Sequence, residues 1–194
     1  MKSDSDDDRC AARRSRRNPF TWRELQSIIS AGDLHKLVRS EEQEQTYLNA
    51  RRKIQNEWGS IYDYLLCSKF QFLPDEGCGQ KRSNPTFEEW QSMMKSGDND
   101  ALEQTRVVMT LNDFPYYFEE GVDHFIVWKL GGDITTIDIE DGKMDILRQA
   151  GCSNKELIDD SSVFLHWHNP PELKSLPDID HVHILFHRKA MNRV

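Results

Sequence analysis

The sequence predicts an α+β fold in which N-terminal helices pack on a mainly antiparallel sheet formed by the C-terminal half. Two observations support this prediction. Up to Met94, apolar residues recur at the three- and four-residue spacing of amphipathic helices, whereas from Val107 onward they alternate as in strands. A chain that places its helices first and its strands later is typical of an α+β layer arrangement.

Helices are predicted where a capping residue precedes an apolar stripe. Thr21 and Ser40 each stand three residues before a Glu or Gln, which is the capping-box pattern, and Thr86 begins a similar segment. Gly32 and Gly59 are expected to end the first two helices. The predicted helices of the first half cover residues 22–31, 41–58, 61–65 and 86–94.

Strands are predicted from period-two alternation in the second half, at residues 107–111, 121–130, 163–168 and 181–187. In the second of these strands one face is expected to carry Val122, His124, Ile126, Trp128 and Leu130. A helix is expected over 143–150, and the glycine- and proline-containing segment 74–85 is expected to be a loop.

The composition predicts a tail at residues 1–17 and a single α+β domain at 18–194. The tail holds six cations and four acids with few apolar residues, which is typical of a solvated, disordered segment. Because the whole chain has a net charge of −8 and the tail carries +2, the remaining residues carry −10. An acidic body argues against indiscriminate nucleic-acid binding, which depends on neutralising phosphates.

Targeting and cofactor signals are sparse. No stretch approaches the roughly 20 apolar residues of a membrane helix, and no apolar signal segment follows Met1, so we expect no membrane association and a cytoplasmic location. The arginine cluster at 13–17 is a candidate nuclear-import signal, although a tail without function explains it as well. The four cysteines lack the paired spacing of a zinc site, and no nucleotide-binding or hydrolase motif is present, so these signals assign no cofactor and no metal ligand.

Histidines concentrate near the C-terminus, where five of the seven lie in the last 29 residues. Alternation places His181, His183 and His187 on one strand face, and His166 and His168 on a face of the preceding strand. If these strands are neighbours, up to five imidazoles line one surface. Three interpretations remain open: a metal site, a proton-transfer site, or a half-polar sheet face whose histidines bond water or backbone.

A second cluster surrounds the turn Asn112–Tyr116. Asp113, Tyr116, Glu119 and Asp123 gather carboxylates and a phenol near His124 in the sequence. Such a group can receive a cation such as a guanidinium or an ammonium. The alternative is an ordinary turn, because Asn, Asp and Pro need no function to explain them.

Six short sequence blocks are distinctive in their combination and order. They lie at residues 20–25, 57–60, 111–116, 122–128, 169–175 and 181–183. Together they resemble a fungal family of unknown function that includes the N-acetylglucosamine-induced protein and arginine-containing cyclodipeptide synthases, over residues 19–188. The synthases of that family join arginine and a second amino acid, both taken from aminoacyl-tRNA.

This resemblance implies an arginine pocket, a base and a tRNA-binding surface. The pocket would use Asn112, Asp113, Tyr116, Glu119, Asp123 and Asn169. The base would come from His124, His181 or His183. The tRNA would meet Lys36, Arg39, Arg51, Arg52 and Lys53, which a solvated helix face explains equally well.

The synthases are also associated with an Asp-Asp-x-x-Glu motif. Its nearest counterpart is Asn99-Asp100-Ala101-Leu102-Glu103, in which Asn replaces the first Asp, so Asp100 and Glu103 complete the catalytic candidates. The leading expectation is therefore aminoacyl-tRNA-dependent formation of an arginine-containing cyclic dipeptide. The alternatives are a non-catalytic protein of the N-acetylglucosamine-induced type that binds a small metabolite, and a metal-dependent enzyme that uses the His-x-His strands.

Overall fold

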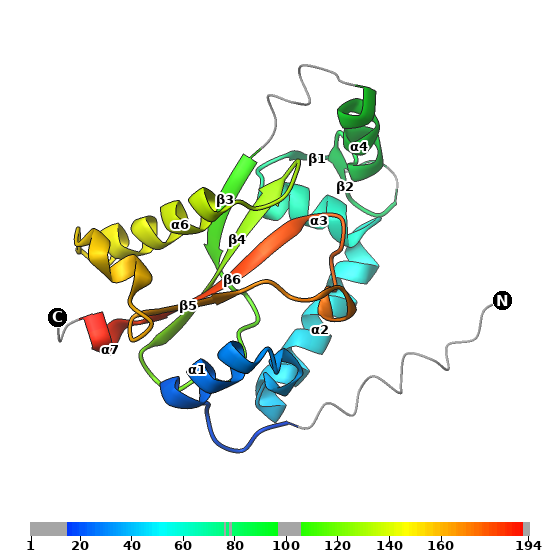
Figure 1. Ribbon diagram of the computed structural model, residues 1–194. Helices are drawn as coiled ribbons and strands as arrows, with labels where there is room; N and C mark the ends of the chain where they lie inside the picture. The colour runs from blue at the N-terminus through cyan, green and yellow to red at the C-terminus, as the bar shows by residue number, and fades with distance from the viewer. Residues whose placement is uncertain (1–14, 76, 78, 97–105, 192–194) are drawn as a thin grey trace.

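A four-stranded antiparallel sheet forms the centre of the fold (Figure 1). This computed structural model describes residues 15–75, 77, 79–96 and 106–191. The strand order is β3-β4-β6-β5. The strands are β3 (Arg106–Leu111), β4 (Val122–Leu130), β5 (Phe164–Trp167) and β6 (Asp180–His187). The predicted α+β class is confirmed, with N-terminal helices and a sheet built from the C-terminal half.

One face of the sheet is covered by α6 (Thr136–Gln149) and the short helix η3 (Lys155–Asp159). The helix can lie close to β4 because it presents Gly142 there: a Cβ at this position would come 2.8 Å from Val127 Cγ2. The helix predicted at 143–150 was therefore too short at its start. Its true beginning is a capping box in which Thr135 and Asp138 bond each other's backbone N–H groups.

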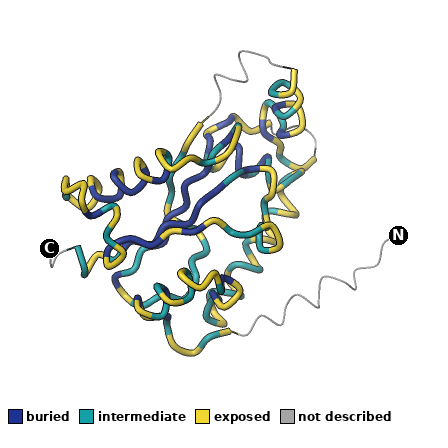
Figure 2. The backbone as a smooth tube through the Cα atoms, in the orientation of Figure 1, coloured by how far each residue is buried: buried dark blue, intermediate teal, exposed yellow. Residues whose placement is uncertain are grey.

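The opposite face is covered at its two ends by different helices. At one end α3 (Ile61–Ser68) and α4 (Phe87–Ser96) pack on Ile126 and Trp128, and at the other α1 (Trp22–Ala31) packs on Leu165 and Leu185. The predicted inward face of β4 is confirmed, but the intervening residues Phe125 and Val127 are buried as well. The sheet is thus enclosed on both faces, and Figure 2 shows its central strands buried.

The long helix α2 (Glu41–Glu57), all of whose residues are described, buries none of them. It runs beside the sheet face that lies between the two helical clusters (Figure 1). The capping boxes expected at Thr21 and Ser40 are both confirmed. Single-turn helices complete the chain: η2 (Leu34–Lys36), η4 (Pro171–Leu173) and α7 (Arg188–Met191).

The segment predicted as a loop at 74–85 instead contributes to a small hairpin of β1 (Leu73–Asp75) and β2 (Arg82–Asn84). The buried carboxylate of Asp63 accepts hydrogen bonds from Ser83 Oγ (2.8 Å) and from the Phe87 N–H (2.9 Å). It therefore joins α3, the hairpin and the start of α4. The strands are short and mostly exposed, so alternation could not reveal them.

The first described residues contact the domain. Arg16 pairs with Glu24 at 2.6 Å and lies 3.8 Å above the Phe20 ring. The division between a tail at 1–17 and a domain at 18–194 stays a prediction, since residues 1–14 lie outside the described residues. Among the described residues, no helix has the length and apolar character needed to cross a membrane.

Candidate functional site

Two buried histidines form a direct hydrogen bond on the face between the helical clusters. His124 lies on β4 and His183 on β6, and His124 Nε2 is 2.9 Å from His183 Nδ1. His124 faces Leu185 across the ladder, so the two imidazoles are diagonal neighbours on one face. Their residues are only 3% and 6% exposed, respectively. The pair is a closed polar unit inside a largely apolar layer.

The orientation of this pair follows from Trp167 and Asn169. The indole N–H of Trp167 donates to Asn169 Oδ1 at 3.1 Å, which leaves the Asn169 amide nitrogen 3.1 Å from His183 Nε2. An amide nitrogen only donates, so His183 Nε2 accepts and its proton is on Nδ1. His183 Nδ1 then donates to His124 Nε2, and the His124 proton is also on Nδ1.

The contact with Asn112 is consistent with this direction. Its oxygen accepts the Phe114 N–H at 2.9 Å, and its amide nitrogen lies 3.2 Å from His124 Nδ1 and 3.5 Å from Nε2. A partner along the lone pair of one ring nitrogen would lie much farther from the other nitrogen. The amide therefore lies over the ring rather than at its edge, and the proton on His124 Nδ1 meets no second in-plane donor.

Burial keeps both imidazoles neutral. Desolvation, aided by the charge of Arg39, lowers the pKa of His124 to about 3. Desolvation likewise holds the pKa of His183 well below its usual value, and the neighbouring His124 adds to the effect. Two neutral, hydrogen-bonded imidazoles can take up a proton at one end and release one at the other without storing charge.

Aromatic rings enclose the pair. Trp167 stacks on His183 with 4.8 Å between ring centroids, and Tyr116 stacks on His124 at 5.8 Å. Phe118 lies 5.4 Å from His124. These rings exclude water, which explains the large pKa shifts, and they leave the amides of Asn112 and Asn169 as the half-buried polar groups at the two ends.

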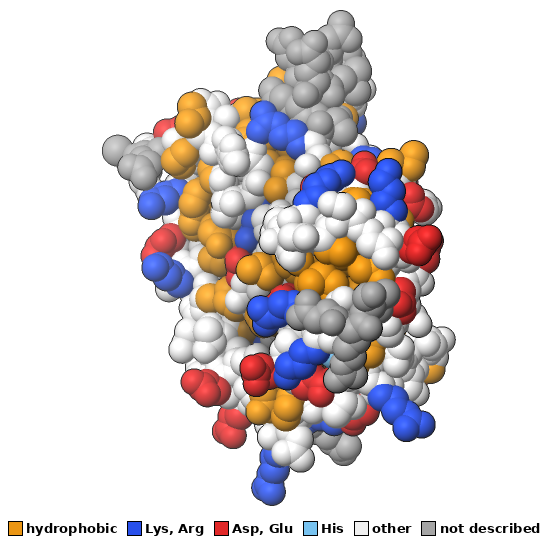
Figure 3. All heavy atoms as spheres, turned by 90° about the vertical axis from the view of Figure 1, so that its left-hand side faces the viewer, with side chains coloured by type: hydrophobic (Ala, Val, Ile, Leu, Met, Phe, Trp, Pro, Cys, Tyr) orange, Lys and Arg blue, Asp and Glu red, His pale blue; other side chains and the backbone are white. Residues whose placement is uncertain are grey.

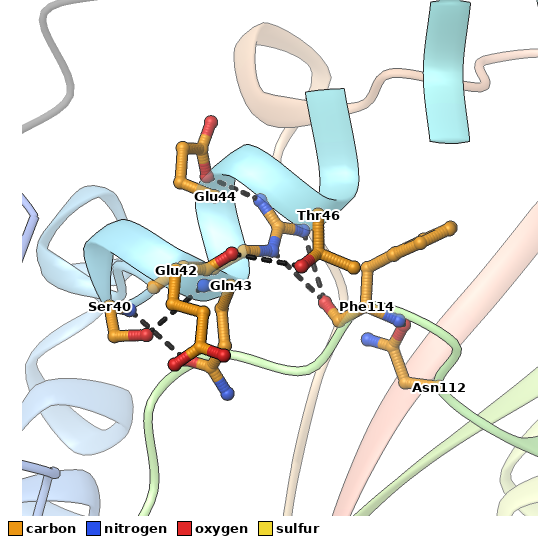
Figure 4. A network of polar contacts seen from close by, with 8 residues as sticks. Ser40, Glu42, Gln43, Glu44, Thr46, Asn112 and Phe114 are labelled. Carbon is orange, nitrogen blue, oxygen red and sulfur yellow. Dashed lines mark hydrogen bonds and ion pairs between the residues drawn. The ribbon is translucent and has the colours of Figure 1, made fainter. Parts of the chain in front are cut away.

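Arg39 fixes the turn that carries Asn112 to α2 by bonding Phe114 and Glu44, which Figure 4 labels. The guanidinium donates twice to the Phe114 carbonyl, at 3.1 and 3.2 Å, and pairs with Glu44 at 3.1 Å. The ring of Tyr47 lies 4.2 Å from its Cζ. Arg39 was expected to meet tRNA, but its side chain is only 11% exposed. Its observed role is to position the turn.

The predicted acidic cluster beside His124 is not formed. Asp113 pairs with Lys69 at 2.6 Å, and Glu119 accepts the Trp22 N–H at 2.6 Å at the start of α1. Asp123 pairs with Arg188 at 3.1 Å, and its side chain points to the other face from its neighbour His124. Each carboxylate thus has a separate structural partner. The catalytic candidates Asp100 and Glu103 lie outside the described residues.

The prediction of five imidazoles on one surface is wrong. In the β5–β6 register His166 faces Ile184, which places it on the α6 side, opposite His183. His187 stacks on Trp22 at 4.8 Å, away from the pair. His181 shares the face of His183, at 5.6 Å between centroids, but its Nδ1 bonds the Ile179 carbonyl at 3.1 Å. No three His, Cys, Asp or Glu side chains converge as a metal site in the described part of the chain.

Sequence reasoning found both histidines and both amides of the site but missed two residues that organise them. Trp167 had no role predicted beyond its place in the strand expected at 163–168, and Arg39 was assigned to RNA contact. Neither role has a local signal, because each depends on a partner from a distant segment: Asn112–Tyr116 for Arg39, and His183 for Trp167.

The chain, an α+β domain with the buried His124–His183 pair, matches a known sequence family. Residues 21–187 match the family described as "Protein of unknown function (DUF3605)", and the chain is a member of that family. The membership confirms that the sequence blocks mark a family of unknown function, and none of the comparisons names a cyclodipeptide synthase.

Two named relatives are similar in sequence. N-acetylglucosamine-induced protein 1 of Candida albicans is 28% identical over 116 residues, 57% of this chain and 43% of that protein. The chain therefore matches less than half the length of that relative. Uncharacterized protein YPL067C of Saccharomyces cerevisiae is 27% identical over 173 residues, 86% of this chain and 78% of that protein.

One solved structure shares the fold. The crystal structure of HTC1 superposes with a TM-score of 0.52 at 22% identity, covering 87% of this chain and 85% of that one. None of these three names specifies a reaction, so the comparisons define the family and the fold.

Proposed function

We propose that this protein catalyses acyl transfer between aminoacyl groups carried by tRNA, forming a cyclic dipeptide that contains arginine. The hydrogen-bonded pair His124–His183 is the observation that carries the proposal. The choice of aminoacyl-tRNA and arginine rests on the family resemblance of the sequence blocks. The chemistry needs a device that moves one proton for each peptide bond formed, and the pair is such a device.

The ring holds two peptide bonds, the second formed when the free α-amine of the dipeptidyl ester attacks its own ester carbonyl and releases the second tRNA, and each bond balances around one proton transfer. The α-amine of one aminoacyl group attacks the ester carbonyl of the other, so a C–N bond forms and the ester C–O bond breaks. The amine loses a proton and the departing ribose oxygen gains one. A relay of two neutral imidazoles can accept the first proton and release another in a concerted step.

The lowered pKa of His124 fits this role, because it disfavours the imidazolium and so favours a concerted transfer in which both rings stay neutral. Because Asn112 and Asn169 are half-buried whereas the pair is buried, a substrate would have to approach past their amides. A substrate that displaces the Asn112 amide from the ring would meet His124 directly. Recognition of the arginine guanidinium would not use a shared pocket of Asp113, Glu119 and Asp123, since these are paired elsewhere.

The direct test is mass spectrometry of bacteria that express the full chain, searched for arginine-containing cyclic dipeptides. The host supplies charged tRNA. We expect a product from the wild type and from the control His35→Gln, whose side chain is exposed and lies outside the strands β4 and β6 that carry the pair. His124→Gln and His183→Gln should each reduce the product by about 100-fold or more, the usual contribution of general acid–base catalysis.

Two outcomes would contradict this proposal, the first for the role of the histidine pair and the second for the reaction itself. Unchanged product in a folded His124→Gln protein would show that the relay takes no part in the reaction. Absence of any product from soluble, folded wild type would favour the second candidate, a non-catalytic protein that binds a small metabolite. The near-complete burial of the pair and its hydrogen bond to Asn169 favour that candidate, because such a network can equally serve to shape a binding surface.

A further inference from the structure

The outer edge of β3 carries backbone groups that no described residue bonds. β3 is an edge strand that pairs with β4 on one side only. The pairing continues to Asn112, whose N–H donates to the carbonyl of the directly opposite residue His124 at 2.8 Å. In an antiparallel pair, bonded residues alternate with residues that point outward. The N–H and C=O groups of Val107, Met109 and Leu111 therefore face away from β4.

A hollow of about 240 Å³ lies beside this edge, between β3, β4 and α6. Its apolar floor is formed by Val107, Met109 and Val127. Val107 and Leu111, which flank Met109 on the α6 side of β3, are 44% and 59% exposed. Figure 3, which views the molecule from the left-hand side of Figure 1, shows several groups of hydrophobic side chains exposed between charged ones on that side.

The rim of the hollow is acidic. Asp138, Asp141 and Asp145 follow at helical spacing on the face of α6 that borders it. Asp138 is held by Lys129 at 2.8 Å, and Asp145 pairs with Arg148 on the exposed surface. Asp141 forms no ion pair with any residue that the structure describes. An apolar floor beneath a carboxylate rim complements a side chain with an apolar stem and a cationic head.

β3 also lacks the features that protect free strand edges. Natural edges are usually guarded by prolines, bulges or charged side chains. β3 has no proline, and its one charged residue is Arg106 at its first position. A strand that adds to this edge would complete the backbone hydrogen bonds and cover the exposed apolar side chains.

We infer that the β3 edge binds an extended segment of a partner protein in which basic residues alternate with apolar ones. In an added strand every second side chain points to the α6 side, so lysines or arginines at alternate positions would reach over Val107 and Met109 to Asp141. A second copy of this chain fits less well, because β3-to-β3 pairing would place two acidic α6 helices on the same side of the joined sheet.

The test is fluorescence polarisation of the full chain with a labelled hexapeptide, Arg-Val-Arg-Val-Arg-Val. The control peptide is Arg-Arg-Arg-Val-Val-Val, which has the same charge without the alternation. Asp141→Lys should weaken binding of the alternating peptide about tenfold, since an attraction at a partly exposed site becomes a repulsion. The matched variant Glu140→Lys changes the neighbouring exposed acid, which does not line the hollow, and should bind within about twofold of the wild type.

Amide hydrogen exchange by NMR locates the bound peptide. Saturating peptide should slow exchange at Val107, Met109 and Leu111, whose N–H groups would gain acceptors. Equal affinity for the two peptides, or equal losses for Asp141→Lys and Glu140→Lys, would overturn the inference in favour of unspecific charge attraction. Absence of binding, protection at a different surface, or protection of these amides in a concentration-dependent dimer without peptide would overturn it as well.

Discussion

Acidification should destabilise this protein because the folded state cannot protonate His124. The pKa of His124 is lowered to about 3 in the fold, whereas an imidazole in an unfolded chain titrates near 6.5. Between these values the unfolded state binds more protons, so stability falls as the pH falls below about 6.5. From pH 7 to pH 5 this one group removes about 2 kcal/mol from the free energy of unfolding. His183 acts in the same direction.

Urea unfolding at pH 7 and pH 5 measures this loss. The wild type should lose at least about 2 kcal/mol between the two conditions, and the matched control His35→Gln should lose the same amount. His124→Gln should lose about 2 kcal/mol less, because it removes the titrating group. Equal losses in wild type and His124→Gln would show that this imidazole is accessible to protons in the folded state, and the buried relay would be wrong.

Three substitutions test other parts of the fold. Asp63→Ala should lower the free energy of unfolding by about 3 kcal/mol in chemical denaturation, because the two groups that donate to Asp63 lose a buried acceptor. The exposed control Asp75→Ala should change it by less than about 0.5 kcal/mol. Gly142→Ala should destabilise by about 1–3 kcal/mol despite the better helix propensity of alanine, because its Cβ meets Val127; a stabilised variant would contradict the close approach. Glu119→Gln should lower the free energy of unfolding by about 1 kcal/mol, because it weakens the hydrogen bond to the Trp22 N–H at the start of α1, and it should leave product formation unchanged. Loss of product in a folded variant would instead show that Glu119 takes part in the reaction.

The fold was predictable where local signals and long-range packing agree. The capping boxes at Thr21 and Ser40 set the helix starts, and alternation in 121–130 placed Ile126 and Trp128 inside. The start of α6 was missed because it is acidic, and its helical signal is the cap at Thr135 rather than an apolar stripe.

The site was predictable in composition but not in arrangement. His124 and His183 were both candidates, yet only the β4–β6 register brings their nitrogens within 2.9 Å. Likewise, only the β5–β6 register shows that His166 lies on the α6 face of the sheet, opposite His183. The carboxylates near His124 in the sequence pair with residues from distant segments, and Asp113 pairs with Lys69. The sequence does not reveal such pairs, because the tertiary fold decides which groups lie beside a carboxylate.

The neutral, directional imidazole pair is the central claim, and the ring nitrogens report on it directly. Long-range ¹H–¹⁵N NMR of the full chain at pH 7 distinguishes protonated from unprotonated ring nitrogens, and His124→Gln and His183→Gln assign the signals. We predict that both rings are neutral, with a proton on Nδ1 and none on Nε2. An imidazolium, or a proton on Nε2 of either ring, would contradict the relay direction derived from Trp167 and Asn169.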